Sequence, residues 1–321
     1  MTGERVVARF GALAGVTDRV VGLDDVTAPV VVGCSGGPDS LTLLAVAVDR
    51  RLDPIAVHVD HGLREGSGAE SATVARAAQE LGARVDLRKI EVAPGGNLEA
   101  RAREARYEAL HQAADEHGAR DVLVGHTADD QAETVLLALL RGSGSAGLAG
   151  MALRRGRIVR PLLEVRRADT EASCIALGLD PVRDPTNEDP SYRRAWIRHV
   201  GLPLLSTAAS RDLVPVLARQ ANVLREESEY LDSLARAAWP PDPDDPAAAC
   251  LAQLPGPLGR RAVRCWLGPP PPSFDEVERV LAVARGEARA TQLTGGRCVR
   301  RTRGRLVVEE TGHPGVPRSA G

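Results

Sequence analysis

The sequence predicts an α/β fold, in which a parallel sheet carries helices on both faces, followed by a smaller and mainly helical C-terminal domain. Three observations favour this fold. Short apolar runs alternate with helical patterns through the first half of the chain. A glycine-rich turn joins the first apolar run to a helical pattern. The composition then changes after about residue 206.

Four short apolar runs are predicted to form buried strands, because each is bounded by turn residues. They cover residues 28–33, 54–59, 83–92 and 121–126, and the helical patterns cover 39–49, 68–81, 97–117 and 128–140. Strands that alternate with helices favour parallel pairing. Ligands of such sheets bind where the strands end and loops lead into helices, so the loops at that edge are the candidate site.

The second half begins with a long helical pattern over residues 207–238. A segment rich in Pro and Asp follows at 239–250, and a Pro run lies at 268–272. Such runs break regular structure, and an α/β-looking segment closes the chain. We therefore expect a catalytic domain over residues 1–207 and a C-terminal domain over residues 208–321.

Composition excludes several classes of protein. The net charge of −2 argues against a protein that is basic throughout, although local basic patches remain compatible with it. The five Cys form no C-x-x-C pair, which disfavours a zinc knuckle or an iron–sulfur site and fits a reduced, cytoplasmic enzyme. Because no stretch approaches about 18 apolar residues, the sequence predicts no membrane span.

The glycine-rich turn is Ser35-Gly36-Gly37-Pro38-Asp39-Ser40. It lacks the Lys of a Walker A loop, yet its glycines let backbone N–H groups turn toward an anion, and a helix N-terminus follows. A carboxylate in an anion site is repulsive unless a cation lies between, so Asp39 indicates Mg²⁺ bound to a polyphosphate. The alternative is an ordinary strand-to-helix turn capped by Asp and Ser.

Two further stretches contain polar residues at the predicted sheet edge. His58, Val59 and His61 follow the second strand, where an adenine could lie. Arg103 and Arg106 share one face of a helix, although paired with glutamates they would also suit a solvated surface.

The segment from Gly125 to Met151 carries an acidic pair. His126, Asp130 and Glu133 fall at i, i+4 and i+7, so they share one helix face. Neighbouring carboxylates are costly unless they face a cation, either a metal or a substrate ammonium group. A zinc site or a structural capping cluster is the alternative interpretation. Arg141 and Gly142 then begin a second turn suited to phosphate.

Taken together, these motifs resemble the PP-loop ATP pyrophosphatase superfamily and, within it, the tRNA(Ile)-lysidine synthetase family. The shared blocks are SGGPDS, HVDHGLR, AREARY, GHTADDQAET, RGSGSAGLAGM, RPLL, DPTN and R-x-x-I-R, and they cover about residues 28–205. The C-terminal GGRCVRRTRGRL is also similar to the family's first C-terminal domain, and the chain looks like the short form that lacks an additional one. One departure is Ala195, where the family commonly has Asn.

The resemblance implies a two-step reaction on the CAU-anticodon isoleucine tRNA. ATP and Mg²⁺ adenylate the C2 carbonyl oxygen of the wobble cytidine, and free L-lysine then displaces AMP to give lysidine. The implied catalytic residues are Asp39, Arg106 and His126, with Asp39 as the Mg²⁺ ligand. Asp130 and Glu133 would bind lysine. The implied ATP contacts are Ser35–Ser40, His58, Val59, His61, Arg141 and Gly142.

The tRNA contacts implied by the resemblance are Arg160, Arg194, Arg198, Arg300, Arg301 and Arg303. Five arginines lie within nine residues between 297 and 305, and the alternative for such a run is a solvated face. The competing functions are a PP-loop tRNA thiolase, which usually carries paired catalytic cysteines, and a nucleotide-binding sensor without turnover. The sequence permits a homodimer without requiring one.

Overall fold

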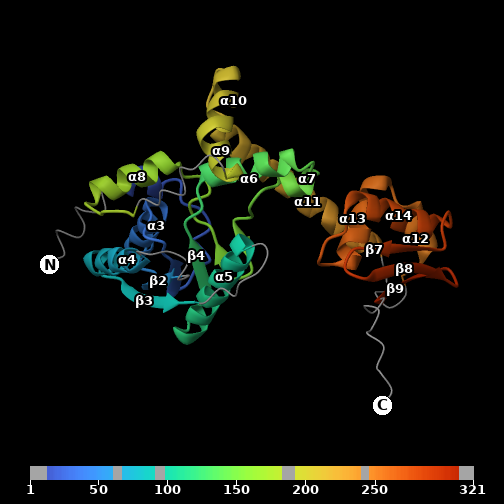
Figure 1. The fold of residues 1–321 in the computed structure, drawn as a ribbon, viewed down its shortest axis with the longest axis horizontal. Coiled ribbons are helices and arrows are strands. Elements are labelled where there is room, and N and C mark those ends of the chain that lie inside the picture. The colour runs from blue at the N-terminus through green and yellow to red at the C-terminus, as the bar shows by residue number, and fades with distance from the viewer. Residues whose placement is uncertain (1–12, 61–66, 91–97, 183–191, 240–245, 311–321) are drawn as a thin grey trace, which may run out of the picture. The chain divides into compact units, whose positions relative to one another are not determined.

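Five parallel strands and one antiparallel edge strand form a sheet in the computed structural model, which describes residues 13–60, 67–90, 98–182, 192–239 and 246–310. The spatial order is β3-β2-β1-β4-β6-β5, and only β5 runs antiparallel to its neighbour. The strands are β1 (Val30–Gly33), β2 (Pro54–Asp60), β3 (Arg84–Lys89), β4 (Asp121–Val124), β5 (Arg154–Arg155) and β6 (Ile158–Val159). The predicted parallel sheet is thus confirmed (Figure 1), while the two-residue strands β5 and β6 were not predicted because they are too short to show a period.

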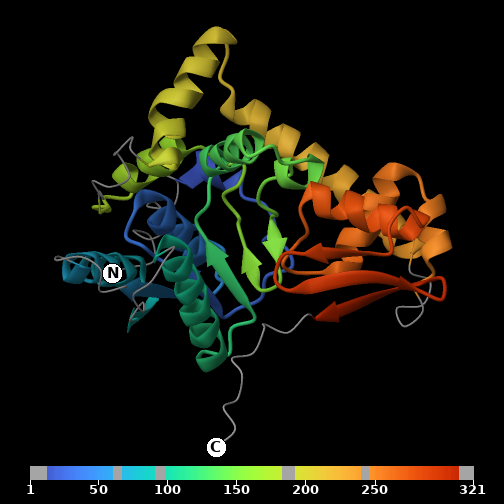
Figure 2. The same ribbon diagram turned by 45° about the vertical axis from the view of Figure 1, so that its right-hand side comes forward.

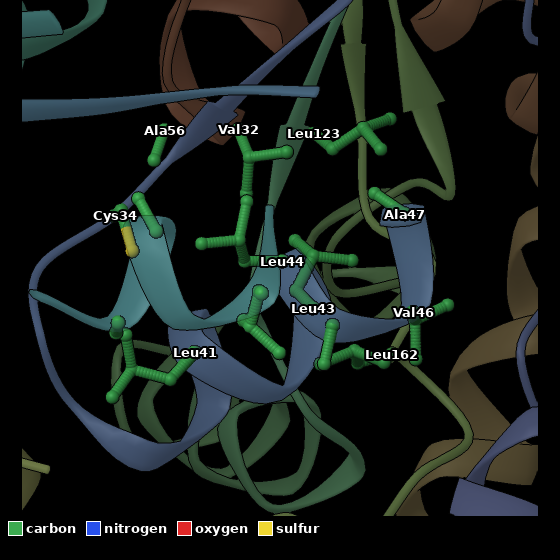
Figure 3. Close-up of a cluster of buried hydrophobic side chains, with 14 of the residues drawn as sticks. Val32, Cys34, Leu41, Leu43, Leu44, Val46, Ala47, Ala56, Leu123 and Leu162 are labelled. Carbon is green, nitrogen blue, oxygen red and sulfur yellow. The ribbon is translucent and has the colours of Figure 1, made fainter. Parts of the chain in front are cut away.

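Helices cover both faces of this sheet, as predicted. The helices up to residue 176 are α2 (Ala14–Thr17), α3 (Pro38–Asp49), α4 (Ser67–Leu81), α5 (Leu98–Glu116), α6 (Ala128–Leu140), α7 (Ser145–Leu148) and α8 (Arg167–Ala176), of which α6 packs on the segment that follows the sheet. Val30 and Val32 of β1 face the cluster formed with α3, α4 and α8, which Figure 3 shows around Leu41 and Leu44. Val31 points to the opposite cluster, formed with α5. This alternation is what a strand buried on both faces requires.

A helical segment after the sheet consists of α9 (Arg193–Trp196), a π-helical turn η3 (Ile197–Gly201) and α10 (Leu202–Ala208). The long helix α11 (Val214–Ala238) follows. The predicted helix over 207–238 is therefore interrupted. Ser210 has φ of +52°, and the Asp212 side chain accepts a hydrogen bond from the Val214 N–H at 3.0 Å. Ser and Asp favour such breaks because their side chains compete for backbone groups.

The chain divides into two compact units, residues 1–225 and 226–321, with the division inside α11. The second unit contains α12 (Ala248–Gln253), α13 (Gly256–Leu267) and α14 (Phe274–Arg285). Its antiparallel sheet has the order β7-β8-β9, from Ala290–Leu293, Arg297–Thr302 and Arg305–Glu310, drawn in red in Figure 2. The functional boundary expected between residues 207 and 208 stays a prediction. No helix in the described part of the chain is long and apolar enough to cross a membrane.

Glu276 ties α14 to the sheet of the second unit. Its carboxylate accepts hydrogen bonds from the Ser273 N–H at 2.7 Å and the Thr294 N–H at 2.5 Å. These backbone donors at Thr294 and Ser273 lower the pKa of Glu276 from 4.5 to about 2. A capping box at the start of a helix normally stabilises it by about 1 kcal/mol, and here the same side chain also fixes the turn between β7 and β8.

We expect Glu276→Gln to destabilise the second unit by about 1–2 kcal/mol at pH 7, because the amide cannot replace a charged acceptor. The folded pKa lies below the unfolded value, so the stabilisation is present above pH 4.5 and is lost as pH falls toward 2. Urea unfolding followed by tryptophan fluorescence checks this, since Trp239 and Trp266 lie in this unit. Glu278→Gln, which affects only a partly exposed pair with Arg260, is the control. An equal loss in both variants, or a loss for Glu276→Gln that does not shrink toward pH 2, contradicts the prediction.

Candidate active site

The glycine loop, residues 35–40, lies where β1 ends and α3 begins. Gly36 has φ of +83°, a conformation that favours glycine, and Gly37 is the extended residue before α3. The Ser40 hydroxyl donates to the Gly37 carbonyl at 2.9 Å and accepts from the Ser35 N–H at 3.2 Å. The loop is therefore closed by its own hydrogen bonds, and the start of α3 provides the positive end of a helix dipole for an anion.

The loop after β4 packs directly on the glycine loop. A Cβ atom at Gly125 would lie 3.0 Å from the backbone carbon and oxygen of Asp39 and 3.1 Å from the Ser40 nitrogen. The sheet order places β1 between β2 and β4, so the two loops meet at the point where the order reverses. Gly125 was predicted only as part of a motif, and the close approach of the α3 backbone explains why glycine stands there.

We expect Gly125→Ala to weaken ATP binding by at least about tenfold, because backbone atoms of α3 must move to admit the methyl group. Isothermal titration with a non-hydrolysable ATP analogue measures the change. Gly15→Ala is the matched control, since no atom lies within 4 Å of a Cβ at that position. Equal affinity in the two variants would show that the loop tolerates the displacement.

Three carboxylates and three arginines form a cluster beside the glycine loop. The carboxylates belong to Asp39 of α3 and to Asp130 and Glu133 of α6. Arg167, the first residue of α8, lies 3.5 Å from Asp39, 3.0 Å from Asp130 and 3.4 Å from Glu133. One guanidinium thus contacts both the glycine loop and the acidic pair Asp130 and Glu133. The structure brings together residues that sequence analysis assigned to ATP and to lysine.

Arg194 and Arg198 complete the cluster from the segment α9–η3. Arg194 Nε lies 2.7 Å from Glu133, and its Nη2 lies 3.1 Å from Asp130. Arg198 Nε lies 2.6 Å from Glu133. The Glu133 side chain is fully buried and faces three guanidiniums, so the acidic pair is a site that holds cations. Both arginines were expected to contact tRNA, whereas here their guanidiniums hold the acidic pair.

Arg167 was not among the predicted site residues. The residue lies in Arg166-Arg167-Ala168-Asp169-Thr170, shortly after the RPLL motif, and no spacing linked it to α6. It reaches the site because α8 packs on α3, where the Thr42 hydroxyl donates to the Thr170 carbonyl at 3.0 Å. The available signal was a pair of arginines at the start of a helix that follows a shared motif.

Opposite pKa shifts separate the two aspartates of the cluster. Burial raises the pKa of Asp39 to about 6, although Arg167 and the Thr170 hydroxyl oppose it. Burial would also raise the pKa of Asp130, but Arg167 and Arg194 outweigh it and lower the pKa to about 2. Asp130 therefore stays ionised at neutral pH, while Asp39 titrates close to the physiological range.

Asp130 has a structural role as well. One of its carboxylate oxygens accepts hydrogen bonds from the Thr127 N–H at 2.9 Å and the Thr127 hydroxyl at 3.0 Å, closing a capping box on α6. Its other oxygen faces Arg167 and Arg194. Asp130 therefore takes part both in a capping box and in ion pairs with arginines of the same chain, while its binding of a substrate ammonium group stays a prediction.

His126 and Arg106 lie near this cluster. Burial lowers the pKa of His126 to about 3, and Arg160, Arg103 and Arg106 lower it further while Asp130 opposes them. His126 is therefore neutral at pH 7, and its buried Nδ1 has no hydrogen-bond partner in the described structure. Burial also lowers the pKa of Arg106. Arg160 is buried and donates to the Ala152 carbonyl at 2.8 Å, which suits support of the site better than an exposed tRNA contact.

The remaining expected ATP contacts divide into two groups. His58 is buried at the end of β2, and its Nδ1 lies 2.9 Å from the Cys34 carbonyl, so His58 and Val59 stand beside the glycine loop. Arg141 and Gly142 are exposed at the opposite end of α6 from Asp130, about 15–20 Å along the helix. The structure does not bring them to the glycine loop. His61 and the DPTN motif lie outside the described residues.

The C-terminal arginines point to different faces of the sheet β7-β8-β9. Arg301 turns inward and donates to the Ala284 carbonyl at the end of α14 at 3.0 Å, which gives it a structural role. Arg300 is exposed and lies 3.5 Å from Glu309, and Arg303 is exposed in the turn between β8 and β9. The expected group of three tRNA contacts is thus divided, with Arg300 and Arg303 on the surface.

Known proteins resemble this chain in sequence and in fold. A family model described as a PP-loop domain matches residues 17–205. The tRNA(Ile)-lysidine synthase of Salinispora tropica is 44% identical over 307 residues, covering 88% of this chain and 91% of the relative. That of Thermobifida fusca is 41% identical, covering 87% and 91%, and that of Streptomyces coelicolor is 42% identical, covering 91% and 88%.

A solved structure shares the fold at low sequence identity. The U34-tRNA thiolase NcsA from Methanococcus maripaludis, determined with its 4Fe-4S cluster, superposes with a TM-score of 0.54. It is 17% identical and covers 70% of this chain and 81% of its own. This likeness concerns the fold alone, and it agrees with the sheet and helix arrangement described above.

Proposed function

The chain belongs to the tRNA(Ile)-lysidine synthase family, and from that premise we propose how its residues divide the work of the reaction. The protein is an ATP-using ligase that forms a carbon–nitrogen bond in tRNA modification. The amine that it joins is free L-lysine, and the acceptor is C2 of the wobble cytidine in tRNA(Ile) with a CAU anticodon. The product, lysidine, pairs with A and changes decoding from AUG to AUA.

One observation carries this proposal. The guanidinium of Arg167 contacts Asp39 of the glycine loop and both carboxylates of the acidic pair. A polyphosphate on the loop and an ammonium group on the acidic pair would therefore lie within the span of one side chain. That proximity is what a reaction between an adenylated base and a lysine amine requires.

The glycine loop would hold the pyrophosphate that leaves ATP. Its backbone N–H groups and the start of α3 would stabilise the negative charge that grows as the bond to the α-phosphate breaks. Breaking that bond transfers AMP to the C2 oxygen of cytidine, and the oxygen becomes part of a good leaving group. Arg106, which stays charged, would stabilise the adenylate.

Asp39 fits a Mg²⁺ ion whose other ligands are phosphate oxygens and water. The described residues contain no group of three or more His, Cys, Asp or Glu side chains that could hold a metal alone, which agrees with a metal that arrives with the nucleotide. Mg²⁺ would neutralise part of the negative charge of the ATP phosphates. Asp39 must be ionised to hold it, so its raised pKa makes this step sensitive to pH.

Asp130 and Glu133 would bind the lysine ammonium groups by charge-assisted hydrogen bonds. Arginine guanidiniums occupy these carboxylates in the structure, so lysine would share or displace them. The amine must be neutral when it attacks C2, and the new C–N bond forms as the C–O bond to AMP breaks. His126, neutral at pH 7, would position the base through its unpartnered Nδ1.

Arg300 and Arg303 would contact the tRNA backbone, where phosphate contacts position the substrate without reading its sequence. The activity also implies a cytoplasmic location, where tRNA and free lysine are present. A homodimer stays a prediction.

The test is to incubate the protein with ATP, Mg²⁺, lysine and CAU-anticodon tRNA(Ile), with elongator tRNA(Met) as the matched control. Lysine should appear only in tRNA(Ile), with one AMP and one pyrophosphate released per lysine. Dependence on a sulfur donor instead of lysine would make the protein a thiolase. ATP binding without turnover on either tRNA would overturn the proposal.

A further inference from the structure

An aromatic side chain stands exposed on the segment that carries Arg194 and Arg198. The chain contains three tryptophans. Trp239 is fully buried and Trp266 half-buried in the second unit, where their rings contact each other. Trp196 is 44% exposed and lies on α9, a helix that Figure 1 labels. Trp196 is thus the exposed one of the three tryptophans, and Tyr192, four residues before it, is 56% exposed.

The π-helical turn η3 fixes the position of this ring. The Leu202 N–H donates to the Ile197 carbonyl, which closes the wide turn of residues 197–201. The six-membered ring of Trp196 packs against Gly201, where a Cβ would lie 3.1 Å from its Cζ3 atom. Such π-helical turns are rare and occur often at functional sites. The contact with Gly201 therefore restricts the Trp196 side chain, so that less side-chain conformational entropy is lost when a planar ligand stacks on the ring.

The segment that carries Trp196 is rich in basic residues, two of which, Arg194 and Arg198, pair with Asp130 and Glu133. Residues 190–211 contain four arginines, one histidine and no acidic residue. Arg193 and His199 are exposed, three residues before and after Trp196. A planar aromatic surface beside the positive charge of Arg193 is complementary to a nucleic-acid base and its phosphate.

The same segment connects Trp196 to the candidate active site. Arg194 and Arg198 lie two residues on either side of it and turn the other way, toward Asp130 and Glu133. Ala195 and Ile197 are buried beneath the segment. The segment therefore presents an aromatic ring on its outer side while its inner side holds the carboxylates.

We propose that Trp196, with Arg193 beside it, is a stacking platform for an unpaired base of the tRNA substrate, next to the site of lysine transfer. The proposal rests on the proposed function for the identity of the nucleic acid. Bases of single-stranded loops are free to stack on aromatic side chains, whereas bases within a duplex are not. The platform therefore selects the loop that carries the reacting cytidine, and Trp196 positions the substrate without touching the reacting atoms.

The first experiment measures the affinity for CAU-anticodon tRNA(Ile) by fluorescence anisotropy of labelled tRNA at fixed salt. Trp196→Ala should weaken binding by roughly 5- to 100-fold, as the loss of one stacked base does. Trp196→Phe should stay within about threefold of the wild type. The salt dependence should be unchanged in both, while Arg193→Ala should reduce its slope by about one.

The second experiment uses the exposed tryptophan as its own probe. Saturating tRNA should quench part of the intrinsic fluorescence of the wild type, and the quenching should vanish in Trp196→Phe because the other two tryptophans are not exposed. Gly201→Ala supplies a variant that keeps the indole. Gly201 has helical φ and ψ of −63° and −56°, so alanine suits the backbone, yet its methyl group displaces the ring. It should bind tRNA more weakly without a lower melting temperature.

Unchanged affinity in Trp196→Ala, or no quenching in the wild type, would overturn the platform. A change in sedimentation of Trp196→Ala without a change in tRNA affinity would instead make the ring a contact between proteins, and would also overturn it. These failures are separate from failure of the proposed function. If the proposed function is wrong, the wild type itself will transfer no lysine to tRNA(Ile).

Discussion

Glu133→Gln is expected to lower the rate of lysine transfer by about 10²–10³-fold, the effect typical of removing one preorganised charged group from an active site. Glu133 has no exposed side-chain surface and lies within 3.4 Å of Arg167, Arg194 and Arg198. Water therefore cannot take the place of the Glu133 carboxylate, whereas the Asp130 side chain is slightly exposed. The amide keeps the shape and loses the attraction for an ammonium group.

The two half-reactions make this prediction specific. Pyrophosphate release in a single turnover without lysine reports adenylation, and transfer of labelled lysine reports the second step. Glu133→Gln should reduce the second far more than the first, with a raised KM for lysine. Glu171→Gln, on an exposed part of α8, is the matched control. A loss confined to pyrophosphate release would assign Glu133 to ATP instead.

Asp39→Asn is expected to reduce pyrophosphate release by at least about 10²-fold, because the amide cannot replace a carboxylate ligand of Mg²⁺. In the wild type, the kcat/KM of adenylation for ATP, which reports the free enzyme, should fall as pH decreases through about 6, where burial has placed the pKa of Asp39. The variant should lose that acid limb. The control is Asp49→Asn, at the exposed opposite end of the same helix. Retained ATP cleavage in Asp39→Asn would remove Asp39 from the mechanism.

The same substitution should stabilise the protein near neutral pH. The folded pKa of about 6 lies above the usual value of 3.8, so the folded state binds the proton more tightly and this group lowers stability as pH rises from about 4 to 6. An amide avoids this cost, which is at most about 3 kcal/mol. We expect a melting temperature a few degrees higher at pH 7.5 and no gain at pH 4. A lower melting temperature at pH 7.5 would mean that the contact with Arg167 outweighs the burial of charge.

Much of the sheet was predictable from sequence because its strands are buried on both faces. Val30–Gly33 and Asp121–Val124 are fully buried, so each reads as an apolar run between turn residues. The edge strand β5, two arginines long, has no such pattern. Its place in the sheet depends on pairing with β6, which a local pattern does not reveal.

The candidate site was predictable where residues share one local element. Asp130 and Glu133 lie three apart on α6, and the glycine loop is continuous in sequence. The contacts of Arg167, Arg194 and Arg198 depend on the packing of α8 and η3 against α3 and α6 and join residues more than 30 apart. For the same reason, the opposite orientations of Arg300 and Arg301 follow from strand register and not from charge.

Under the proposed site assignments, the position of Arg167 would make the binding of ATP and the binding of lysine thermodynamically dependent on each other. Its charge is shared between Asp39 and the acidic pair, so a polyphosphate that draws the guanidinium toward the glycine loop weakens its hold on Asp130 and Glu133. Those carboxylates then become more available to an ammonium group. Linkage requires the converse: bound lysine must raise the affinity for ATP by the same factor. The enzyme would thus favour the state in which both substrates are present, and an ATP bound without lysine would be held less tightly.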